Sequence, residues 1–133
     1  MKIHDVTKFL GHAYENGGEL IMGRGSYVNQ RTRLRCEKAD IVIGEDCTIA
    51  SDVFMTTAPR AHYKPPHNKP EGIVIGNNVW IGHGAMISGG VTIGDYAVIG
   101  MGTVVTKDVP SFAVMVGNPG EIVGPRPDVE EII

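Results

Sequence analysis

The chain has 133 residues and carries 12 Lys and Arg against 15 Asp and Glu, which gives a formal net charge of −3. Its basic residues are scattered rather than gathered in one stripe, which argues against nucleic acid as a primary partner. No apolar run approaches the roughly 18 residues of a transmembrane segment, and no signal-peptide segment is visible, so the expected location is the cytoplasm. The two cysteines predict neither a disulfide framework nor a metal site.

Residues 1–20 lack a regular period and contain the turn signal Asn16-Gly17-Gly18, which predicts an N-terminal segment that covers one open end of the fold. From residue 21 onward a weak six-residue pattern begins. A phase shift near Ala39-Asp40 then resets the frame at Ile43. We therefore expect repeated coils over residues 21–110. The weak frames start at Met22, Val28 and Leu34.

The strict part of the six-residue period extends from Ile43 to Pro110, with one interruption. Its first position is always aliphatic or Met, its second is small and usually glycine, and its fifth is small or β-branched. Two inward positions per six residues describe a flat strand followed by a corner, and a glycine lets the chain turn there. Three such strands close a triangular coil, and stacked coils form an all-β parallel solenoid. The strict frames start at Ile43, Ile49, Met55, Ile75, Ile81, Ile87, Ile93, Ile99 and Val105.

The interruption lies between Thr57 and Ile73, where four prolines cannot continue a strand. We predict that residues 59–72 form a loop pushed out of the coil. Loops on rigid scaffolds are where binding and catalysis concentrate, so this loop is the first place to look for a site. Beyond Pro110, residues 111–133 are expected to leave the solenoid as a C-terminal tail. The whole chain is then a single domain.

Several segments carry a resemblance to a known family. Over about residues 27–123 the chain resembles the maltose, galactoside and colanic-acid type O-acetyltransferases, which are hexapeptide-repeat acyltransferases. The resemblance implies a left-handed parallel β-helix, acetyl-CoA as cosubstrate without a metal, and a sugar or sugar-containing acceptor. It also implies a homotrimer with active sites between subunits. The segments are Ile75-Gly76-Asn77-Asn78-Val79-Trp80-Ile81-Gly82, Gly90-Val91-Thr92-Ile93-Gly94-Asp95, Val104-Val105-Thr106-Lys107-Asp108-Val109-Pro110 and Gly117-Asn118-Pro119.

His62 is the expected catalytic residue. In the family a histidine just before the extruded loop acts as the base, and Thr57-Ala58-Pro59-Arg60-Ala61-His62 is the nearest match in this chain. Transfer of an acetyl group from a thioester to a hydroxyl needs a base for the hydroxyl proton, and an imidazole with an ordinary pKa of about 6.5 suits neutral pH. The alternative interpretation is a solvated loop histidine without a role. His67 is the reserve candidate.

Further candidate residues lie on the coils. Asn29 resembles the family asparagine that contacts the acceptor, and it is equally well explained as a corner residue. Trp80 faces outward where the relatives place an aromatic residue beside the acceptor and the pantetheine arm, and a subunit contact is the alternative. The remaining residues are candidate contacts to coenzyme A. The alternative for the charged ones is an ordinary solvated side chain, and the alternative for the Gly-Asn-Pro segment is a plain turn. These candidate contacts are Gly82, Lys107, Gly117, Asn118, Pro119 and Arg126.

Three other functions stay open at this point. N-acetylation of an amino sugar is the nearest, since an amine and a hydroxyl can enter the same cleft. The run Ile81-Gly82-His83-Gly84 also resembles the γ-class carbonic anhydrases, which bind zinc through three histidines. The His62-x4-His67 spacing crosses a Pro-Pro bend, which makes a poor rigid frame for a metal. The third alternative is a solenoid without catalytic activity that serves as a structural scaffold.

Overall fold

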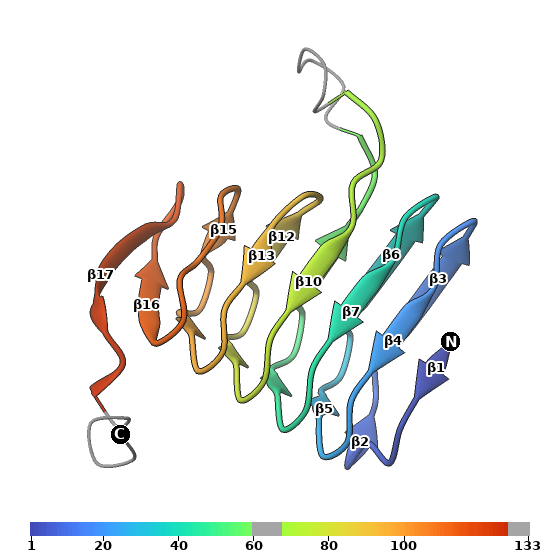
Figure 1. The fold of residues 1–133 in the computed structure, drawn as a ribbon, viewed down its shortest axis with the longest axis horizontal. Helices are drawn as coiled ribbons and strands as arrows, with labels where there is room; N and C mark the ends of the chain where they lie inside the picture. Colours follow the sequence, from blue (N-terminus) through green and yellow to red (C-terminus); the bar gives the residue numbers. More distant parts are fainter. Residues whose placement is uncertain (60–67, 128–133) are drawn as a thin grey trace.

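The computed structural model describes residues 1–59 and 68–127, and it is a stack of coils whose strands form three sheets (Figure 1). Strands that follow one another in the chain lie in different sheets, and up to β15 every third strand returns to the same sheet. The three sheets are therefore the faces of a triangular prism. Each strand pairs in parallel with its equivalents in the coils before and after it, and β17 alone among the described strands runs antiparallel, beside β16.

The strands are short, because each spans one flat face. Sheet A consists of β1 (Lys2–Ile3), β4 (Leu20–Met22), β7 (Ile41–Ile43), β10 (Ile73–Ile75) and β13 (Thr92–Ile93). Sheet B consists of β2 (Lys8–Phe9), β5 (Tyr27–Val28), β8 (Thr48–Ile49), β11 (Trp80–Ile81), β14 (Val98–Ile99), β16 (Ala113–Val116) and β17 (Glu121–Pro125). Sheet C consists of β3 (His12–Asn16), β6 (Arg33–Glu37), β9 (Phe54–Thr56), β12 (Met86–Ser88) and β15 (Val104–Val105).

Stacked aliphatic side chains fill the prism. The strand register places equivalent positions above one another, so Ile43 pairs with Ile75 and Ile75 with Ile93 along sheet A. Every first-position residue of the strict frames is at most 2% exposed, which confirms the predicted inward face. The fifth positions are buried as well, at Cys47, Val53, Val79, Ala85, Val91, Ala97, Thr103 and Val109. Burial of this apolar surface, at roughly 25 cal/mol per Å², is the main stabilising term.

The coils begin earlier than expected, so the predicted start near residue 21 is wrong. β1, β2 and β3 already form one coil, and they pair with β4, β5 and β6 of the next coil. Ile3 and Phe9, six residues apart, pack against the core from this coil. The period was hidden because His4 and Leu10 stand where small residues were expected. An end coil has a neighbour on one side only, and it tolerates larger corner residues.

The solenoid also ends later than expected. Instead of leaving the prism after Pro110, the chain adds β16 to sheet B, where Val98 pairs with Val114 and Met115 is fully buried. β17 then folds back antiparallel on β16 and covers that edge of the sheet (Figure 1). An antiparallel strand satisfies the backbone groups of β16 that no further coil would pair. Residues 128–133 lie outside the described part of the chain.

The irregular segments of the sequence stack at one corner, between sheets C and A. The turn at Gly17, which has φ +78°, lies beside Lys38 of the phase-shifted segment, and the N–H of Glu19 donates to Asp40 Oδ1 at 2.8 Å. The described flanks of the predicted loop, residues 57–59 and 68–72, lie at this same corner, one coil further on (Figure 1). The backbone N–H of Glu71 donates to the carbonyl of Thr57 at 3.2 Å and so closes the base of the loop. Insertions are thus confined to one edge.

Both cysteines are expected to resist alkylation in the folded protein. Cys36 and Cys47 are at most 1% exposed, and burial raises the pKa of the Cys36 thiol to about 11. A thiol with that pKa is roughly 0.1% thiolate at pH 8, and the thiolate is the reactive form. Mass spectrometry after iodoacetamide treatment at pH 8 should show no adduct on the native chain and two adducts in concentrated guanidinium chloride. Rapid labelling of the native chain would contradict the buried placement.

Candidate active site

His62 and His67 lie outside the described residues, so the site is built from the parts of the prism that flank the loop. The Thr57 hydroxyl accepts a hydrogen bond from the backbone N–H of Glu37 at 2.7 Å and donates to the Glu37 carbonyl at 3.0 Å. Thr57 is fully buried. The residue that begins the loop is therefore fixed to the coil beneath it.

A groove follows the edge where sheets B and C meet, which we call the B/C corner. It has a volume of about 370 Å³ and a mostly apolar lining that includes Trp80, Val98 and Met101. Trp80, at the start of β11, is 53% exposed, and Met101 is 77% exposed. Gly82 turns the chain here, and a Cβ at this position would lie 2.6 Å from the Met101 backbone nitrogen. Close stacking of the coils thus already requires glycine at this position.

The B/C corner brings several predicted residues into one column. Asn29 lies at this corner two coils before Gly82, and its Oδ1 accepts from the backbone N–H of Gln30 at 2.7 Å, as a turn residue does. The Gly117-Asn118-Pro119 segment follows β16 at the same corner, one coil beyond Gly100. Asn29, Trp80, Gly82 and Gly117-Asn118-Pro119 therefore share one edge of the prism.

Two predicted residues are not brought to this corner. Lys107 lies at the corner between sheets C and A, where its Nζ pairs with the Glu121 carboxylate at 2.9 Å. Arg126 lies at the third corner, where its guanidinium donates to the Asn78 carbonyl at 3.0 Å and lies 6.0 Å from the centre of the Tyr96 ring. In this structure both side chains hold the C-terminal segment against the prism.

A histidine at the B/C corner has the geometry of an oriented imidazole. His83 Nδ1 lies 2.9 Å from Ser51 Oγ and 3.6 Å from Asp52 Oδ2, while the ring is more than half exposed. The fork of Arg31 holds the pKa of the Asp52 carboxyl below its ordinary value, so this group stays negatively charged. Fixing Nδ1 leaves Nε2 for a ligand in the Trp80 groove. No catalytic role was predicted for this histidine from the sequence.

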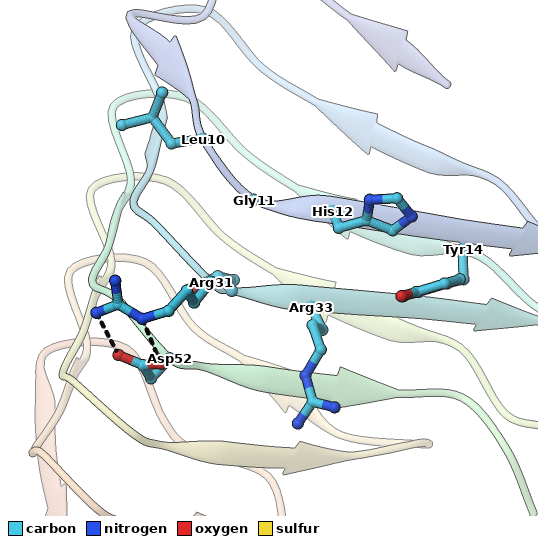
Figure 2. Close-up of a pocket in the computed structure, with 8 residues that line it drawn as sticks. Leu10, Gly11, His12, Tyr14, Arg31, Arg33 and Asp52 are labelled. Atoms are coloured by element: carbon cyan, nitrogen blue, oxygen red, sulfur yellow. Dashed lines mark hydrogen bonds and ion pairs between the residues drawn. The ribbon is translucent and has the colours of Figure 1, made fainter.

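A second cavity lies on the sheet C side of the same corner (Figure 2). It has a volume of about 590 Å³, and its charged residues include the Arg31–Asp52 pair and Arg33. Asp52 therefore lines this cavity and contacts His83 of the first groove. Sequence reasoning missed this cavity. The signal that could have found it is the outward alternation of arginines at positions 31, 33 and 35.

The described residues hold neither a cluster of metal-binding side chains nor a helix that could span a membrane. Residues 1–59 and 68–127 contain no group of three or more His, Cys, Asp or Glu side chains placed to hold a metal ion. Within the same ranges no helix has the length and apolarity needed to cross a membrane.

Comparison with known proteins agrees with this geometry. A model of the bacterial transferase hexapeptide family (six repeats) matches residues 72–107. The galactoside O-acetyltransferase of Escherichia coli K12 is 36% identical over 114 residues, which are 83% of this chain and 56% of that protein. The chain spans about half the length of the curated relatives it matches.

Two solved structures are similar to this chain over nearly its whole length, coils included. The polySia-specific acetyltransferase NeuO superposes with a TM-score of 0.83 and 34% identity, over 93% of this chain and 60% of that one. A galactoside acetyltransferase in complex with coenzyme A superposes with a TM-score of 0.76 and 29% identity, over 97% of this chain and 67% of that one. The chain is therefore a left-handed β-helix and belongs to the hexapeptide-repeat acetyltransferase family.

Proposed function

We propose that the protein transfers an acetyl group from acetyl-CoA to a hydroxyl of a sugar or sugar-containing acceptor. The observation that carries the proposal is the apolar groove along Trp80, Gly82 and Met101 at the B/C corner. A narrow apolar groove beside polar corner groups suits the pantetheine arm of coenzyme A. The similarity to a galactoside O-acetyltransferase and to a neighbour solved with coenzyme A supports the same choice. Because acetyl-CoA is a cytoplasmic metabolite, we place the reaction in the cytoplasm.

The proposed reaction is a direct acyl transfer. The acceptor oxygen attacks the thioester carbonyl, a base takes the hydroxyl proton, and the C–S bond breaks to release the thiolate of coenzyme A. A backbone N–H stabilises the negative oxygen of the tetrahedral intermediate. We assign the base to His62 of the loop. His83 is the competing base, because its Nδ1 is held by Ser51 and Asp52 while its ring faces solvent.

We infer that the active unit is a homotrimer. Exposed apolar side chains flank the B/C corner on both faces, with Trp80 on sheet B and Met86 on sheet C, and Met101 lies on the corner itself. Contact with a neighbouring prism would bury part of this apolar surface, and cyclic symmetry would repeat the contact three times. Such a contact would also enclose the Trp80 groove. Sedimentation equilibrium tests this inference, and a monomer at micromolar concentration would oppose it.

Binding of acetyl-CoA is expected to change the fluorescence of Trp80, the single tryptophan of the chain. About half of its surface is exposed, so a pantetheine arm in the groove would displace water from the ring. Titration with excitation at 295 nm should give a saturable blue shift. Free ADP, which lacks the pantetheine arm, serves as the control and should produce none. Calorimetric binding of acetyl-CoA without a change in emission would remove Trp80 from the site.

The activity itself is tested by release of the coenzyme A thiol in the presence of neutral sugars and amino sugars. Transfer to sugars that carry only hydroxyls supports O-acetylation. Transfer confined to amino sugars would replace it with N-acetylation. Absence of both acetyl-CoA binding and transfer would favour a scaffold.

A further inference from the structure

The outer face of sheet C carries a cationic and aromatic strip over its first three strands. The strip consists of His12 and Tyr14 on β3, Arg33 and Arg35 on β6, and Phe54 on β9. Side chains alternate along a strand, so Arg33 and Arg35 point outward while Leu34 between them is buried. The register sets Arg33 between His12 and Phe54 on the neighbouring strands.

The strip lies in a continuous groove. The cavity of Figure 2 reaches from the B/C corner to Arg33 and Tyr14. A second hollow of about 400 Å³ shares these two residues and continues to Arg35, Glu37 and Phe54. The groove therefore crosses sheet C from the B/C corner toward the corner between sheets C and A.

The charge of the groove differs in sign from that of the whole chain. Three arginines face two carboxylates here, whereas the chain as a whole has a net charge of −3. Arg31 pairs with Asp52 at 3.0 Å, and Arg35 approaches Glu37 at 3.6 Å, while Glu37 also accepts from Asn16. Arg33 has no carboxylate partner among the described residues. Its guanidinium lies 4.8 Å from the centre of the Phe54 ring.

We propose that this groove binds an acidic group, a carboxylate or a phosphate, on the acceptor saccharide. The planar fork of Arg33 can bind either anion through two parallel hydrogen bonds. The rings of Tyr14 and Phe54 offer apolar faces beside it, which suit the C–H face of a pyranose. The proposal rests on the proposed function, because it specifies the acceptor of that reaction.

The groove also ends beside the groove proposed to hold the pantetheine arm of acetyl-CoA. Asp52 lines the sheet C groove and lies 3.6 Å from His83 Nδ1, and His83 in turn lines the Trp80 groove. A saccharide held by Arg33 thus extends toward the corner that separates the two grooves. Arg33 in this scheme selects the acceptor and takes no part in the proton transfer.

Calorimetry of the full chain in the absence of acetyl-CoA tests the groove separately from the reaction. The probes are trigalacturonate, a neutral galactose trisaccharide of the same length, and glucose 6-phosphate as the phosphate source. We expect trigalacturonate or glucose 6-phosphate to bind at least tenfold more tightly than the neutral trisaccharide, with an affinity that falls as salt rises. Arg33→Ala should lose about tenfold in that affinity. Arg24→Ala, an exposed arginine outside the groove, should bind like the wild type.

The outcomes separate the two proposals. Equal binding of acidic and neutral probes, or binding that Arg33→Ala leaves unchanged, would overturn the acidic acceptor even if the enzyme acetylates neutral sugars. Arg33-dependent binding of an acidic probe without acetyl transfer would support the groove and oppose the proposed activity. With both proposals correct, Arg33→Ala raises KM for the acidic acceptor about tenfold and leaves kcat near its wild-type value.

Discussion

Replacing His62 with alanine is expected to lower kcat for acetyl transfer to a sugar by about 10²–10⁴-fold. A sugar hydroxyl is a weak nucleophile while it keeps its proton, and the base acts as the oxygen attacks. Without an imidazole at this position only water can take the proton. The measurement is the rate of coenzyme A thiol release at saturating acetyl-CoA, with the Trp80 emission shift as a check that binding of acetyl-CoA persists.

Two histidine variants serve as controls for this assignment. His67→Ala keeps His62 and should retain most of the activity. His83→Ala removes the imidazole that Ser51 and Asp52 hold at the B/C corner. If His83→Ala loses far more activity than His62→Ala, the base is His83 and the loop histidine has no catalytic role. A loss confined to His62→Ala supports the base in the loop.

The coils were predictable because their period reflects a steric limit. Only small or aliphatic side chains fit inside a prism this narrow. Inward positions such as those of Ile81 and Ala85 therefore repeat every six residues, once on each of the three faces. The two ends were not predictable by the same rule. Phe9 packs against the core from a coil with only one neighbour, and Met115 does so in a coil that β17 closes. Larger residues and a reversed strand are tolerated there.

The candidate site was predictable only in part. Trp80 and Gly82 stand in the repeat, so their place on a face and a corner follows from their positions in the frame. The contact between His83 and Ser51 joins residues 32 apart in the sequence, on either side of the loop. This contact can be predicted from the sequence only if the whole loop is left out when successive coils are aligned. Arg33 belongs to a weak frame before the phase shift. The six-residue period therefore does not indicate that Arg33 lies beside Phe54 on the same face of the prism.

Replacing Ile75 with alanine is expected to reduce the free energy of unfolding by about 2–5 kcal/mol. Ile75 is 1% exposed and lies between Ile43 and Ile93 in the stack of sheet A, so truncation leaves a cavity between two coils. Stacked coils relax little, because each backbone is hydrogen-bonded to the coils on both sides. Urea unfolding followed by circular dichroism, at one fixed protein concentration, measures the loss.

Val74→Ala is the matched control, because Val74 precedes Ile75 on β10 and points outward with 46% of its surface exposed. Its truncation removes little buried surface and should cost less than about 1 kcal/mol. The difference between these neighbours isolates the inward stack from the strand propensity of β10. Equal losses would mean that β10 is held mainly by its backbone pairing and not by the aliphatic column. The six-residue period would then result more from the backbone geometry of the coils than from the packing of side chains inside them.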